Sequence, residues 1–148
     1  MTATLPTPAT SNPQQFAPEE WQLRLQLAAA YRIFDHLGWC ELIYGHISLR
    51  LPGPQHHFLI NPYGLRYDEM TASSLVKIDL DGNLVEPSDY PVNPAGFVIH
   101  SAIHEHRDNA HCVMHTHTRA GMAIAALECG LLPHQHERHE SPRIHRLP

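Results

Sequence analysis

The stretch that decides the fold is "HISLRLPGPQHHFLIN", residues 46–61. Residues 46–51 alternate apolar and polar side chains, "PGPQ" follows, and residues 56–61 form a second apolar segment. Alternation with a period of two is typical of a half-buried β-strand, and a short turn between two such segments indicates a hairpin. We therefore expect two antiparallel strands joined across this turn.

The flanking sequence extends this sheet and adds helices. Residues 75–80, "LVKIDL", are followed by an Asp-Gly turn and "LVE", which predicts a second hairpin. Asn93 is a suitable cap for a helix that begins at Pro94. The other predicted elements are helices at 18–37 and 119–129 and a strand at 111–117. This order predicts a layered α/β domain with a largely antiparallel sheet.

Composition narrows the class of protein. The 148 residues suffice for one domain, and 43% hydrophobic with 17% charged residues fits a soluble globular chain. A net charge of −5 and the lack of a basic stripe argue against nucleic-acid binding. The chain has three cysteines and no CxxC, which favours reduced thiols and a cytoplasmic location. The N-terminal residues lack the charged and apolar regions that are typical of a signal peptide, and the longest apolar run, 120–127, is too short for a membrane span.

The two ends differ from the middle of the chain. Residues 1–17 are rich in Thr, Pro and Ala, and we expect a flexible N-terminal arm. Residues 18–133 carry the periodic segments and form the predicted domain. Residues 134–148 contain four His and three Arg but only two aliphatic residues, so we expect a disordered, His-rich tail.

The histidines are the candidate functional residues. In "HCVMHTHT", 111–118, His115 and His117 are two positions apart, so a strand would present both imidazoles on one face. Neutral imidazoles bind Zn²⁺ at ~2.0–2.1 Å, and the pair is a candidate metal clamp. The alternative to a metal site is that one imidazole forms a hydrogen bond within the sheet and the other faces solvent. His100 and His104 are four positions apart and share a helix face, a spacing that can also chelate a metal. We favour the alternative that His100 packs in the core and His104 lies on the surface.

The motifs "YGHISLR", "INPYGLRYDE", "LVKIDLDGNLVE" and above all a helix histidine followed by "VMHTHT" resemble the class II aldolase/adducin family. The resemblance covers roughly residues 20–133 and is strongest to adducin-type bacterial members. It implies a three-layer α/β/α fold with a largely antiparallel central sheet. The change of character after Pro133 suggests that this chain is C-terminally truncated or frameshifted, leaving the fold incomplete there.

The resemblance also implies a site. Zn²⁺, or another divalent metal, would be held by His115, His117 and a third histidine near the C-terminus. His100 is a candidate substitute for that third ligand, or an outer partner of the pair. The tail offers His134, His136, His139 and His145, none in a family context. The substrate-binding candidates are His46, which replaces a family asparagine, and the adjacent Ser73 and Ser74, which are more commonly helix-capping residues.

The family's acid/base glutamate position falls on Gly96, so the catalytic residue is unknown; Tyr44, His100 and Glu105 are alternatives. The resemblance implies a zinc-dependent aldol or retro-aldol lyase on a small hydroxy-carbonyl or sugar-phosphate substrate. We expect that activity to be impaired here, because the base and the third ligand are missing. The alternative is a non-catalytic, adducin-like module that binds metal or oligomerises. Full-length relatives are expected to be homo-oligomers.

Overall fold

The structure, a computed structural model, describes residues 15–129. The chain divides into two compact units, residues 1–117 and 118–148, and each is described by itself. Most of the expected N-terminal arm and all of the expected tail lie outside the described residues. In chain order the elements are α1 (Pro18–His36), β1 (His46–Arg50), β2 (Phe58–Ile60), η2 (Tyr67–Glu69), β3 (Val76–Ile78), α2 (Pro94–His106), β4 (Cys112–His115) and α3 (Arg119–Ala125).

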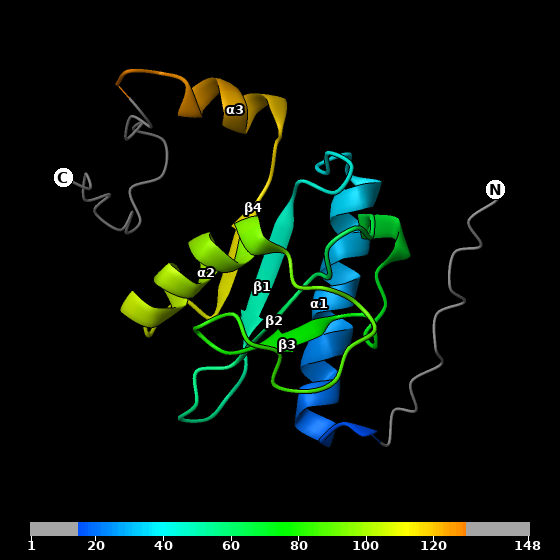
Figure 1. Ribbon diagram of the computed structural model, residues 1–148. Coiled ribbons are helices and arrows are strands. Elements are labelled where there is room, and N and C mark those ends of the chain that lie inside the picture. Colours follow the sequence, from blue (N-terminus) through cyan, green and yellow to red (C-terminus); the bar gives the residue numbers. More distant parts are fainter. Residues whose placement is uncertain (1–14, 130–148) are drawn as a thin grey trace, which may run out of the picture. The chain divides into compact units, whose positions relative to one another are not determined.

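The sheet contains four antiparallel strands in the order β3-β2-β1-β4 (Figure 1). β1 and β2 form the hairpin predicted from residues 46–61, with Ser48 paired to Ile60. After α2 the chain returns as β4 along the free side of β1 and places His115 opposite His46. Strands distant in the sequence are thereby neighbours at the point where the candidate ligands lie.

The second predicted hairpin forms only in part. Its turn is held by Asp79, whose carboxylate accepts the backbone N–H groups of Asp81 at 2.9 Å and Asn83 at 2.8 Å. The return segment makes an isolated bridge between Ile78 and Leu84. The turn prediction is confirmed, but the return is a bridge and not a full strand.

The alternation of side chains along the strands produces two separate hydrophobic layers. One face of the sheet presents Ile47 and Leu59 to α1, where they pack with Leu27 and Tyr31. The opposite face carries a second cluster, against which Phe97 of α2 packs. The two helices therefore cover opposite faces of the sheet (Figure 1), and the predicted three-layer α/β/α fold with an antiparallel sheet is confirmed.

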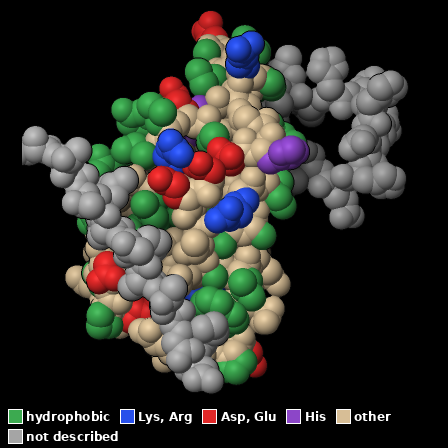
Figure 2. Space-filling view, turned by 90° about the vertical axis from the view of Figure 1, so that its right-hand side faces the viewer, with side chains coloured by type: hydrophobic (Ala, Val, Ile, Leu, Met, Phe, Trp, Pro, Cys, Tyr) green, Lys and Arg blue, Asp and Glu red, His purple; other side chains and the backbone are tan. Residues whose placement is uncertain are grey.

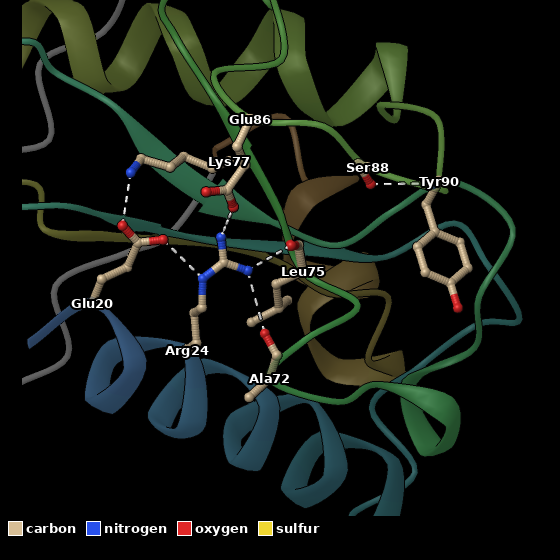
Figure 3. Close-up of polar contacts among 8 residues, drawn as sticks. All are labelled: Glu20, Arg24, Ala72, Leu75, Lys77, Glu86, Ser88 and Tyr90. Carbon is tan, nitrogen blue, oxygen red and sulfur yellow. Dashed lines mark hydrogen bonds and ion pairs between the residues drawn. The ribbon is translucent and has the colours of Figure 1, made fainter. Parts of the chain in front are cut away.

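A fully buried arginine ties α1 to the segments before and after β3 (Figure 3). Arg24 donates from Nε to Glu20 at 2.9 Å and from a terminal nitrogen to the Leu75 carbonyl at 2.8 Å, and it also pairs with Glu86. Lys77 donates to the other oxygen of Glu20 at 2.7 Å. Two carboxylates thus compensate the buried charge, as a buried cation requires.

Local sequence sets the ends of the later helices. α2 begins as predicted, because the Asn93 side chain accepts the Gly96 N–H and Pro94 occupies the first helical turn. α3, in the second unit, begins where Thr118 accepts the Gly121 N–H at 3.0 Å. It ends at Ala125 and is therefore shorter than the predicted 119–129.

The surface shows no extended field of one charge on the face drawn in Figure 2, where basic side chains stand apart among acidic, hydrophobic and uncharged ones. In the described part of the chain, no helix is both long enough and apolar enough to cross a membrane. β4 is an edge strand, and Met114 on it is exposed.

Candidate metal centre

His115 and His117 converge at the end of β4. His115 is the last residue of the strand, and His117 follows in the short segment before α3. Their Nε2 atoms lie 3.0 Å apart, so the HxH spacing brings both rings to one side of the chain even though the second lies beyond the strand. Among residues 15–129, no group of three or more His, Cys, Asp and Glu side chains is arranged to hold a metal. The described residues therefore supply a pair of ligands.

A carboxylate that the sequence did not reveal orients His117. Glu41, in the loop between α1 and β1, bonds to Nδ1 of His117. A carboxylate can only accept, so Nδ1 of a neutral His117 carries the hydrogen and Nε2 keeps its lone pair. Seventy-six positions separate the two residues, and the loop that holds Glu41 has no periodicity. No local sequence pattern indicates that Glu41 and His117 are partners.

His46 occupies the corresponding position behind His115. It is 1% exposed and stands opposite His115 in the strand register. Its Nε2 lies 2.9 Å from Nδ1 of His115. Each member of the pair thus has an outer partner on its Nδ1 atom, which is the usual arrangement around metal-ligating histidines.

Gly96 is packed directly against His46. A Cβ atom at this position would lie 2.9 Å from Cδ1 of Ile60 and 3.2 Å from Cγ of His46. Cβ contacts this short require the neighbours to move. At the position where the resemblance would put the acid/base glutamate, a side chain therefore fits only if Ile60 and the adjacent His46 ring shift.

His100 and His104 extend from α2 toward β1. Nε2 of His100 lies 2.8 Å from Nδ1 of His46, so His100 approaches the pair through His46 and does not face it directly. His104 is bonded to Ser48 at 2.8 Å and is fully buried. The prediction that His104 is a surface residue is wrong, because β1 offers it a hydroxyl partner inside the sheet–helix interface.

The buried rings are neutral near pH 7. Burial lowers the pKa of His100 to about 3 and of His104 to about 4. Burial, helped by the neighbouring His115 and His117, lowers the pKa of His46 to about 4. Burial also lowers the pKa of His115. Neutral imidazole is the form that binds a metal, so no proton competes strongly for His115 at neutral pH.

The remaining candidates lie elsewhere. Ser74 closes a turn with Thr71, whose N–H it accepts at 3.0 Å, and Ser73 also bonds Thr71. This turn precedes β3, at the opposite edge of the sheet from β4, and lines a cavity of about 330 Å³ beside Arg24. Tyr44 is exposed, and Glu105 is an exposed neighbour of His106. The tail histidines fall outside the described residues.

The residues present fit a divalent metal as two of its ligands. The Nδ1 atom of each ring has a partner outside the pair, which leaves the two Nε2 atoms facing each other at 3.0 Å. Imidazole nitrogens bind Zn²⁺ at ~2.0–2.1 Å, so two ligands of a tetrahedral site are about 3.3 Å apart. The observed separation is close to that spacing.

Comparison with known proteins identifies the family. The sequence profile of the Class II Aldolase and Adducin N-terminal domain matches residues 25–146. The match continues past Pro133, where we expected the resemblance to end. Alpha-adducin of Rattus norvegicus is 53% identical over 113 residues, which are 75% of this chain and 15% of that protein.

Two solved structures are similar. An aldolase II superfamily protein from Pseudomonas syringae is 52% identical with a TM-score of 0.76, over 81% of this chain and 48% of that one. An L-fuculose 1-phosphate aldolase from Glaciozyma antarctica PI12 is 35% identical with a TM-score of 0.67, over the same shares of the two chains. The chain spans about half the length of the first curated bacterial relatives. By its profile match, its fold and its relatives, the chain belongs to the class II aldolase and adducin family, matching its N-terminal domain.

Proposed function

We propose that this chain binds a divalent metal, Zn²⁺ by preference, through His115 and His117 and that it acts as a class II aldolase-type carbon–carbon lyase domain. The observation that carries the proposal is the convergence of the two Nε2 atoms at 3.0 Å, each ring held from behind by its own partner. A hydrogen bond between the two Nε2 atoms would need a hydrogen on one of them, whereas His46 and Glu41 engage the Nδ1 hydrogen of each neutral ring.

A bound divalent cation supplies a Lewis acid that polarises a carbonyl and stabilises the negative charge of an enediolate. The residues of this chain supply the rest. His115 and His117 present their Nε2 atoms, while His46 and Glu41 fix the ring orientations. Because a similar structure is an L-fuculose 1-phosphate aldolase, we propose a small hydroxy-carbonyl or sugar-phosphate substrate.

The proton-transfer step is the weak part of this site. Gly96 has no side chain, and the His46 ring is packed against it. His100 is buried and bonded on both nitrogens, so it cannot reach a substrate. Glu41 is the carboxylate at the pair, but His117 already engages it. We therefore propose that retro-aldol turnover is impaired relative to members with a carboxylate base.

A second function is favoured by the same packing. The His46 ring beside Gly96 means that the acid/base space is filled, which suits a domain that binds metal without turnover. Alpha-adducin, at 53% identity, is a similar protein. We propose, as the alternative, a non-catalytic metal-binding or oligomerising module. Homo-oligomers and a cytoplasmic location belong to either proposal.

The decisive experiment is a Zn²⁺ titration of the metal-free chain by calorimetry, followed by an assay of dihydroxyacetone-type release from small sugar phosphates and hydroxy-keto acids. We expect binding in the chain and its loss in His115→Ala and His117→Ala. His106→Ala, an exposed histidine at the end of α2, is the matched control. Binding unaffected by the two ligand substitutions would refute the metal site. Binding without turnover would favour the module over the lyase.

A further inference from the structure

The hydrogen bonds behind His115 form one continuous buried chain. It begins at the imidazole of His115, passes through side chains of β1 and α2, and ends at a backbone carbonyl just before β4. The successive separations are His115 Nδ1 to His46 Nε2, 2.9 Å; His46 Nδ1 to His100 Nε2, 2.8 Å; His100 Nδ1 to Ser48 Oγ, 2.6 Å; Ser48 Oγ to His104 Nε2, 2.8 Å; and His104 Nδ1 to the Ala110 oxygen, 3.1 Å.

The carbonyl at the far end determines which atom donates and which accepts in each of these hydrogen bonds. The oxygen of Ala110 can only accept, so Nδ1 of His104 must donate. A neutral imidazole has one N–H, and Nε2 of His104 is therefore an acceptor. Ser48 has one hydroxyl hydrogen, and it is used in donating to that Nε2.

The same reasoning assigns the donor and acceptor of each remaining hydrogen bond as far as His115, the candidate metal ligand. With its hydrogen engaged, Ser48 accepts from Nδ1–H of His100, which leaves Nε2 of His100 as an acceptor. His46 donates to it from Nδ1, so Nε2 of His46 accepts in turn from Nδ1–H of His115. Nε2 of His115 consequently carries a lone pair, and this is the atom that faces His117.

Burial makes this assignment strict. Ser48, His100 and His104 are 0% exposed and His46 is 1% exposed, so solvent water has no access to replace a partner. A buried imidazolium requires an anion beside it, and the hydrogen-bond partners of the three buried rings are imidazoles, a hydroxyl and a carbonyl, so the rings are neutral. The guanidinium of Arg50, which donates to the His104 carbonyl, also opposes a second proton on His104.

We propose that His46, His100, Ser48 and His104 are positioning residues that hold His115 in its Nδ1–H tautomer and so keep its Nε2 atom available to a metal ion. The role of the metal rests on the proposed function above. The tautomer itself does not, because it follows from the hydrogen bonds of the metal-free chain. A free imidazole in water prefers the opposite, Nε2–H tautomer, so the chain of bonds must act to reverse that preference.

The direct test is the histidine tautomer in the metal-free, 148-residue chain. Long-range ¹H–¹⁵N correlation spectra of ¹⁵N-histidine-labelled protein at pH 7.5 distinguish a protonated ring nitrogen from one with a lone pair. We expect the Nδ1–H form at His46, His100, His104 and His115. An Nε2–H form at His115 in the unsubstituted chain would overturn the proposal without recourse to any variant.

A pair of serine substitutions tests the relay. Ser48→Ala removes the hydroxyl between His100 and His104, and we expect mixed tautomers at His115 and Zn²⁺ affinity reduced about tenfold. Ser101→Ala is the matched control: Ser101 is a buried serine on α2 that donates to the Val98 carbonyl of its own helix at 3.5 Å. We expect an unchanged His115 signal and affinity within about twofold. A pure Nδ1–H form at His115 in folded Ser48→Ala would overturn the relay.

The outcomes separate this proposal from the proposed function. The predicted tautomer without zinc binding would refute the metal site and support the hold of the four residues on the His115 tautomer. Zinc binding by a chain whose His115 is in the Nε2–H form would support the metal site and refute the positioning role.

Discussion

Acid should unfold the metal-free chain through its buried histidines. An unfolded histidine takes up a proton near pH 6.5, whereas the folded chain protonates His100 only near a pKa of about 3 and His104 near about 4. Below pH 6.5 the unfolded state therefore binds more protons than the folded state. Both rings contribute their full stability above pH 6.5, and that contribution is lost as the pH falls toward 4.

The size of the loss follows from the two shifts. At pH 5, compared with neutral pH, each ring lowers the free energy of unfolding by about 2 kcal/mol, and the two rings together lower it by about 4 kcal/mol. Between pH 5 and 6 each ring contributes a slope of about 1.2 kcal/mol per pH unit. The pKa of His46 is lowered as well, so these losses of folding free energy are lower bounds. Small domains have about 5–15 kcal/mol in total, so the effect is large enough to abolish the fold near pH 5.

Urea unfolding at steps of 0.25 pH units (from about 5 to 7.5) measures this slope. We expect His104→Gln to lower the slope of stability against pH by about 1.2 kcal/mol per pH unit. The slope is the readout, because the substitution also removes two hydrogen bonds and lowers stability at every pH. His106→Gln, at an exposed site on the same helix, is the control. Equal slopes in both variants would refute the reasoning.

Three further perturbations test separate parts of the structure. Gly96→Ala should destabilise the chain by about 1–3 kcal/mol in thermal unfolding, because the added Cβ overlaps Ile60 and His46. Alanine is the better helix former, so a gain in stability would contradict the packing. Glu41→Gln should weaken Zn²⁺ binding about tenfold with little change in melting temperature, and equal affinity would exclude its orienting role. Arg24→Gln should cost about 3–5 kcal/mol, because Glu86 loses its partner and Glu20 keeps Lys77 alone, against less than about 0.5 kcal/mol for the exposed Arg66→Gln; similar losses in both would refute the network.

The sequence predicted those features that local patterns determine. Period-two alternation within residues 46–61 is enough to form β1 and β2 and to divide their side chains between two layers. Asn93 followed by Pro94 determines where α2 begins, because the cap and the fixed proline φ act within one turn. The same local reasoning placed His115 and His117 on one side.

The parts that failed depend on long-range pairing. His104 and Ser48 are 56 positions apart, so only the packing of α2 on β1 reveals that His104 is buried. Arg24 meets Glu86 across 62 positions, and no helical periodicity predicts a buried arginine on α1. The length of α3 was overestimated because apolar residues continue past Ala125, although the helix does not.

Gly96 and His46 show why a position-by-position reading gave an incomplete site. Taken alone, Gly96 is a missing acid/base residue, and His46 is a replaced asparagine. In the structure they are one feature, because a Cβ at 96 and the His46 ring cannot both keep their places at 3.2 Å. The glycine makes room for a ring that then bonds both His115 and His100. Under the proposed function, the two positions replace the carboxylate that the family resemblance implies with a buried imidazole behind His115, and this replacement favours holding a metal ligand over transferring a proton to substrate.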